Sequence, residues 1–165
     1  MDTDSWQVAV GSEGDFTGMI PYGGAVCCFK EKRLIRVLGD YPSQYATAEE
    51  ELEGVAPGSG KSLCVVGGLL LYHGRQGVFA YGGGQPRLLS SEFGEIRYEN
   101  AAAGTDGRRY YVSLTGPDEP RLLTWDSLTG LWFREDDTRA LDFCRLGGEL
   151  LMLTDAVSFV VKLVV

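Results

Sequence analysis

Four apolar segments of this chain are each interrupted by a glycine-containing turn, and the turns recur at nearly equal intervals. The glycines that close these turns are Gly24, Gly68, Gly107 and Gly148, which lie 44, 39 and 41 residues apart. Near-equal spacing of this size is the sequence signature of repeat architectures. We therefore expect the chain to be an array of similar supersecondary units.

The unit at residues 100–137 is the clearest. Its first two strand-like segments are separated by an Asp106-Gly107 hairpin turn, where glycine accepts a positive φ. The four segments are NAAAGT, RRYYVSL, RLLTWD and LWFRED, and the last ends in charge, as an edge strand does. Four short strands in a period of about 40 residues favour a β-propeller over a sandwich.

The predicted fold is all-β: a partial β-propeller of three to four four-stranded antiparallel blades, in a single domain covering the 165 residues. The blades are expected at approximately 15–55, 61–98, 100–137 and 140–165. Because a propeller closes with about four to eight blades, we expect the chain to be part of a longer one or to self-associate through its open blade edges.

The chain is acidic, with 23 Asp and Glu against 15 Lys and Arg and a net charge of −8. Non-specific nucleic-acid binding needs a basic surface, so we predict no nucleic-acid contact. No apolar run approaches the roughly 20 residues of a membrane-spanning helix. The start, MDTDSWQ, has neither the basic nor the apolar region of a signal peptide. We therefore predict no membrane segment and a cytoplasmic location during synthesis.

Each of the four cysteines lies within an apolar run, and no C-x-x-C spacing occurs. They are Cys27, Cys28, Cys64 and Cys144. The single histidine, His73, offers little further help to a metal, so we predict buried, reduced thiols and no metal site.

Residues Gly58 to Ser62, GSGKS, resemble part of a phosphate-binding loop. Such a loop would need a glycine in place of Val55 and a helix after the lysine, whereas the strand-like LCVVGGLLLY follows. We interpret this segment as a loop between blades and predict no cofactor.

Carboxylates occur in two runs, Glu49–Glu51 with Glu53, and Glu135–Asp137. Neighbouring residues of a strand point to opposite faces, so neither run supplies the carboxylate pair across a cleft that glycosidases need. We interpret both runs as solvated edges. His73 ends the segment LLLYHG and is interpreted as a turn or surface residue. Since no serine nucleophile elbow occurs either, we assign no catalytic residue and predict that the chain is not an enzyme.

Aromatic residues gather in the expected third blade. Asp126, Gly130 and Trp132 resemble the Asp-box hairpin of sialidases, which is a structural turn. Alternation along the strands places most of the aromatics in the core, while one or two could line a carbohydrate or protein groove. The residues concerned are Tyr110, Tyr111, Trp125, Trp132 and Phe133.

Two landmark runs resemble a known family, the β-propeller virion proteins of tailed bacteriophages and prophages, of the tail-hub or DNA-stabilisation type. They are the order Phe-Lys-Glu, short turn, apolar strand and Gly-x-x-Pro-Ser from Phe29 to Ser43, and Trp-x-x-Glu-Asp from Trp132 to Asp136. The similarity covers residues 15–155, whereas Cys27-Cys28 and the acidic stretch 49–53 depart from the pattern. It implies a structural part of a virion, with other virion subunits as partners and no catalytic residues.

The expected function is therefore that of a non-enzymatic structural or interaction module in a phage or prophage virion, within its tail or head-tail region. The alternative is a carbohydrate-binding or glycan-active propeller, for which the aromatic and acidic content argues. No catalytic, cofactor-binding or metal residue is assigned under the first hypothesis.

The strand phase of the third unit generates a mechanical prediction. Trp132 should pack between two sheets, so Trp132→Ala should lower the free energy of unfolding by about 3–5 kcal/mol, as large buried truncations do. Chemical denaturation followed by fluorescence measures this change. A loss below about 1 kcal/mol would place Trp132 on the solvent face and contradict the assumed phase.

Overall fold

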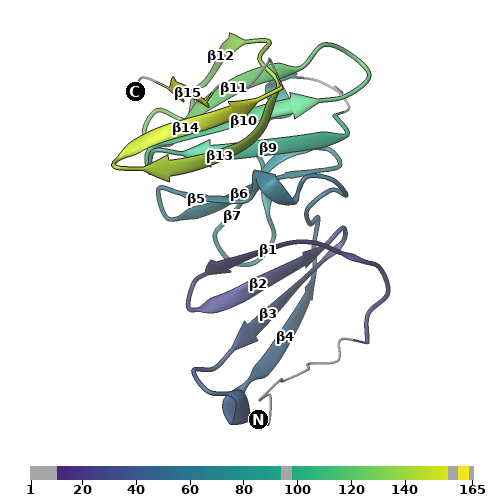
Figure 1. Ribbon diagram of the computed structural model, residues 1–165. Helices are drawn as coiled ribbons and strands as arrows, with labels where there is room; N and C mark the ends of the chain where they lie inside the picture. Colours follow the sequence, from purple (N-terminus) through teal and green to yellow (C-terminus); the bar gives the residue numbers. More distant parts are fainter. Residues whose placement is uncertain (1–10, 94–97, 156–159, 164–165) are drawn as a thin grey trace.

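The computed structural model describes residues 11–93, 98–155 and 160–163, and this part of the chain consists almost entirely of strands (Figure 1). The helical elements are three single 3₁₀ turns: η1 (Pro42–Gln44), η2 (Gly60–Ser62) and η3 (Ser91–Phe93). No helix in the described ranges is long and apolar enough to cross a membrane. The all-β prediction is confirmed.

The strands form four antiparallel sheets, and each sheet is a simple meander in chain order. The first sheet contains β1 (Phe16–Tyr22), β2 (Ala25–Lys30), β3 (Arg33–Leu38) and β4 (Ala46–Glu51). The second contains β5 (Cys64–Val66), β6 (Leu69–Gly74), β7 (Gly77–Tyr81) and β8 (Arg87–Leu88). The third contains β9 (Asn100–Thr105), β10 (Arg109–Thr115), β11 (Arg121–Asp126) and β12 (Trp132–Asp136). The fourth contains β13 (Ala140–Leu146), β14 (Glu149–Thr154) and β15 (Val160–Leu163).

The first hairpin of the first, second and fourth sheets has the same two-residue Gly-Gly loop. The loops are Gly23-Gly24, Gly67-Gly68 and Gly147-Gly148, and all six glycines have a φ between 56° and 86°. A positive φ at both loop positions is the type I′ geometry, which matches the right-handed twist of the flanking strands. The equal loops also set equal registers, because the residues on either side of each loop pair with one another.

The sheets stack on one another in chain order. We call the face of a sheet that points to the next sheet its forward face, and the opposite face its rear face. Cys27 and Phe29 on the forward face of the first sheet pack against Tyr72 and Phe79 of the second. The second and third sheets share a larger cluster, and Leu122 of the third packs with Ala140 and Met152 of the fourth.

The first strands of the second, third and fourth sheets lie close together: β9 contacts both β5 and β13, and β13 runs beside β9 in Figure 1. No sheet closes on itself. The stack therefore has two end faces, the rear face of the first sheet and the forward face of the fourth.

Trp132 lies between the second and third sheets, as its strand phase predicts. Its indole Nε1 donates to the Leu89 carbonyl at 3.1 Å, and its ring meets Phe93 edge-on at 5.2 Å between centroids. The next residue, Phe133, is exposed. Because Trp132 is only half-buried, the cost of removing it is expected at the lower end of the range given above.

The close approach of the third and fourth sheets yields a prediction at Gly104 of β9. A Cβ atom there would lie 2.6 Å from Cβ of Phe143 and 2.9 Å from Cδ1 of Leu150. Gly104→Ala should therefore lower the free energy of unfolding by about 1–3 kcal/mol through overpacking. Chemical denaturation measures the change, with Gly11→Ala as the control, since nothing lies within 4 Å of a Cβ at Gly11. Equal stabilities for the two variants would contradict the stacking of these sheets.

Candidate functional site

The GSGKS segment is a connecting loop whose polar side chains bond to other parts of the protein. The Ser59 hydroxyl and Nδ1 of His73 are hydrogen-bonded at 2.8 Å, and the Ser62 hydroxyl accepts the backbone N–H of His73 at 2.9 Å. Both serines are fully buried. The Lys61 ammonium instead binds the carboxylate of Asp142 in the fourth sheet at 2.9 Å. The polar groups of this loop are thus used within the chain, as its interpretation as a connecting loop predicts.

The interpretation of His73 as a turn or surface residue is wrong. It lies on β6 and is buried, with only 1% of its surface exposed. Burial penalises the imidazolium and lowers the pKa of His73 from 6.5 to about 4. With the Ser59 hydroxyl as its partner and no access from solvent, this imidazole has a structural role. The local sequence does not indicate this burial, because apolar residues precede His73 but Gly74, Arg75 and Gln76 follow it.

The two carboxylate runs lie on outer strands and form ion pairs. On β4, Glu49 pairs with Arg33 at 3.3 Å and Glu50 pairs with Arg36. After β12, Asp137 pairs with Arg134. The runs are solvated edges, as predicted. Among the described residues, no group of three or more His, Cys, Asp or Glu side chains could hold a metal ion.

The cysteines differ from one another more than the sequence indicated. Cys27 and Cys64 are buried, and burial raises the pKa of the Cys64 thiol to about 12. Cys28 is half-buried, and Cys144 is exposed, so the prediction of a buried thiol is wrong for Cys144. Cys144 lies on the forward face of β13, which within the described residues carries no further sheet, and this explains its exposure.

The Asp-box-like turn is structural. Asp126 is buried and forms an ion pair with Arg108 at 2.6 Å, and it accepts the backbone N–H of Leu128 at 2.9 Å. The hydrogen bond from Arg108 is the main cause that lowers the pKa of Asp126 to about 2. Of the five aromatic residues singled out in this region, Tyr110, Tyr111 and Trp125 are buried, Trp132 is half-buried, and Phe133 is 49% exposed.

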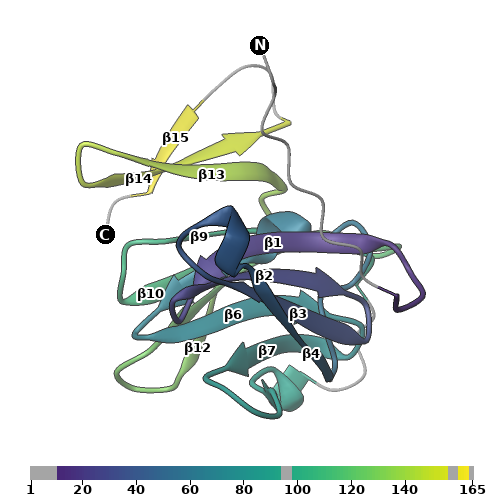
Figure 2. The ribbon, with the colours of Figure 1, turned by 90° about the horizontal axis from the view of Figure 1, so that it is seen from below.

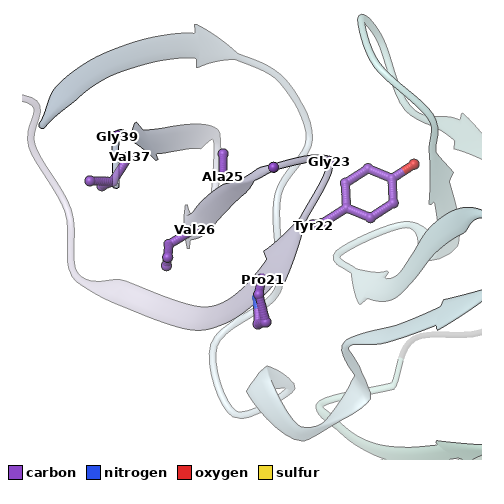
Figure 3. A pocket seen from close by; sticks show the side chains of 8 residues that line it. Pro21, Tyr22, Gly23, Ala25, Val26, Val37 and Gly39 are labelled. Atoms are coloured by element: carbon purple, nitrogen blue, oxygen red, sulfur yellow. The ribbon is translucent and has the colours of Figure 1, made fainter. Parts of the chain in front are cut away.

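A shallow open groove lies on the rear face of the first sheet and has a volume of about 420 Å³ (Figure 3). Pro21, Val26 and Val37 are cross-strand neighbours on β1, β2 and β3 and form its apolar floor. Figure 3 shows Tyr22 pointing the other way, toward the second sheet, where its hydroxyl donates to the Gly68 carbonyl at 2.8 Å. The groove thus offers aliphatic surface and glycine backbone, without a titratable group directed into it.

The open part of this rear face is confined to its hairpin end. Toward the other end, Ile35 and Lys30 are buried, and the Lys30 ammonium donates to the backbone carbonyls of Ser12 and Glu13. The opposite end of the stack also presents apolar side chains, because Leu146, Leu151 and Leu153 share the forward face of the fourth sheet with Cys144. The same face carries the charged residues Asp142 and Glu149, the cross-strand neighbours of Leu153 and Leu146. Leu146 and Leu153 are exposed. Large exposed apolar patches in general mark sites that bind protein, membrane or ligand.

No protein-family model matches this sequence, and no curated protein is similar enough to count as a relative. The resemblance to phage virion proteins therefore rests on the landmark residues alone. A docking role therefore has to be inferred from the two end faces of the stack and not from a related protein.

The burial of His73 predicts a loss of stability in mild acid. The unfolded chain takes up a proton near pH 6.5 and the folded chain only near pH 4, so stability is complete above about pH 6.5 and falls as the pH drops toward 4. The loss from this group should approach about 3 kcal/mol. Urea denaturation between pH 4 and 7.5 measures it.

The variant His73→Asn is the control for this pH effect, because an amide can still reach the Ser59 hydroxyl but does not titrate. Its stability should fall less steeply than that of the wild type between pH 6.5 and 4. Parallel profiles for the two proteins would show that protonation of His73 is not linked to unfolding.

Proposed function

We propose that the four sheets are consecutive blades of a β-propeller, and that this segment is a non-enzymatic structural module of a phage or prophage virion that docks on other protein subunits. The proposal joins the architecture of the chain with the landmark residues from Phe29 to Ser43 and from Trp132 to Asp136. Its location after synthesis would be the virion.

Three features support the propeller. Each of the first three sheets is a four-stranded meander, the sheets pack face to face in chain order, and the first strands of the last three sheets contact one another. A radial arrangement brings first strands together in this way and moves the fourth strands apart. The small residues of β9, Ala101 to Gly104, suit a crowded inner position, and all four are buried.

The docking role rests on one observation above the others: both end faces of the stack expose large apolar side chains where no described sheet covers them. Met19 and Val26 are exposed on the rear face of the first sheet, as are Leu146 and Leu153 on the forward face of the fourth. In a soluble protein such faces lower the free energy when another protein covers them.

The carbohydrate hypothesis has less support. A sugar site needs exposed aromatic platforms beside polar groups, whereas Tyr110, Tyr111 and Trp125 lie in the core. The groove on the first sheet has no carboxylate or amide side chain in its lining. An apolar protein surface suits this groove better than a sugar does.

The decisive experiment locates the chain in particles. Particles from the strain that carries this gene are purified on a density gradient and digested for quantitative mass spectrometry. Peptides of this chain should follow the major capsid protein through the gradient at a constant ratio, while an abundant cytoplasmic enzyme should not. If this chain stays entirely in the soluble fraction while capsid protein peaks in the gradient, the virion proposal is overturned. Binding on a glycan array would then favour the alternative.

A further inference from the structure

We infer that the rear face of the first sheet binds the forward face of the fourth sheet of a second copy of this chain, with Leu146 of one copy seated in the groove formed by Pro21, Val26 and Val37 of the other. This inference rests on the proposed propeller stacking and names one of its partners. Figure 2 shows the first and fourth sheets as separate layers at different places in the molecule.

The three Gly-Gly hairpins fix which residues correspond between sheets. The residue just before the loop is Tyr22 in the first sheet, Val66 in the second and Leu146 in the fourth, and each lies on a forward face. The second residue after the loop is on the rear face. It is Val26 in the first sheet, Leu70 in the second and Leu150 in the fourth.

Exposure at these matched positions depends only on whether a neighbouring sheet is present. Leu70 and Leu150 each have a preceding sheet and are 0% and 2% exposed, whereas Val26 has none among the described residues and is 38% exposed. On the forward side, Val66 faces the third sheet and is 0% exposed, whereas Leu146 is 70% exposed. Each end face therefore exposes apolar side chains at positions that an internal interface buries, and no sheet among the described residues covers it.

The interface between the first and second sheets provides the template for the contact. There Tyr22 on the forward face packs edge-on against Tyr81 on the rear face of the second sheet, with ring centroids 6.1 Å apart. Tyr81 is the cross-strand neighbour of Leu70, just as Val37 is the cross-strand neighbour of Val26. Leu146 takes the place of Tyr22 in this correspondence. The same stacking therefore brings Leu146 of a second copy against Val37, in the groove.

A second copy fits the two faces better than an unrelated partner does. The uncovered surfaces are a forward face and a rear face of one molecule, so a single head-to-tail contact covers both kinds at once. A head-to-tail contact closes into a ring if the rotation allows it. Two copies bring together eight sheets of the kind described, and rings of about four to eight blades are the sizes that close.

The experiment measures the mass of the full 165-residue chain by sedimentation velocity across a hundredfold range of concentration. The wild type should associate reversibly into a pair of chains. Val26→Lys and Leu146→Asp each place a charge in the apolar contact, so either variant alone should remain monomeric. An equimolar mixture of the two should form pairs again, because one of its two contacts is wild type and the other joins the introduced lysine with the introduced aspartate.

Two matched variants control for the loss of an apolar side chain at the surface. Val65→Lys alters a valine of the second sheet that is also 38% exposed, and Leu128→Asp alters a leucine of the β11–β12 turn that is 75% exposed. Neither residue lies on an end face of the stack, so both variants should associate as the wild type does. Circular dichroism and thermal melting show that each variant is folded.

A wild type that stays monomeric at every concentration overturns the inference, as does a Val26→Lys variant that associates normally. Loss of association in Val65→Lys or Leu128→Asp, with the fold retained, also counts against it. None of these outcomes tests the proposed function, because the particle analysis tests it separately. A monomeric chain that is nevertheless found in virions would mean that other subunits cover the end faces.

Discussion

Strand β7 is buried at all five of its residues, and burial on both faces requires a sheet on each side of it. Phe79 and Tyr81 pack toward the first sheet, while Val78 and Ala80 pack toward the third. A single four-stranded meander has no means of covering both of its own faces, so the second sheet owes its stability to its neighbours. The other sheets depend on their neighbours in the same way, and only the two end faces of the stack have no described sheet against them.

Polar groups hold this apolar stack in one arrangement. The η2 turn lies where the first three sheets meet, and the Tyr110 hydroxyl donates to the Ser62 carbonyl at 2.8 Å across the second and third sheets. Ser59, Ser62 and His73 bond to one another inside the protein, so both serine hydroxyls and Nδ1 of His73 keep a hydrogen-bond partner on burial. Apolar contact alone would allow the sheets to slide, whereas this directional network permits one register.

Much of this architecture was accessible from the sequence because it depends on local chemistry. Glycine pairs specify type I′ hairpins, and alternation along LWFRED separates Trp132 from the exposed Phe133, as expected for such a pair. The same alternation is wrong for Tyr110 and Tyr111, which are both buried because β10 has a sheet packed against each of its faces. What escaped prediction depends on contacts between distant segments. His73 is buried because a serine 14 residues earlier in the chain reaches its ring, and Cys144 is exposed because its sheet ends the stack. The groove likewise arises because no sheet among the described residues packs against the rear face of the first sheet, and no local sequence pattern indicates this.

The charge of the chain is compatible with further stacking. A net charge of −8 opposes association in general. However, the paired carboxylates Glu50 and Asp137 belong to the outer part of their sheets, on or just after the fourth strands. The hairpin end of the first sheet presents Pro21, Val26 and Val37 instead, without a charged side chain. At physiological ionic strength, charges more than about 8 Å apart are largely screened. Repulsion between the distant acidic edges is therefore largely screened, whereas the gain from covering the apolar faces acts at contact. We therefore propose that added protein lowers the free energy most where it covers an end face.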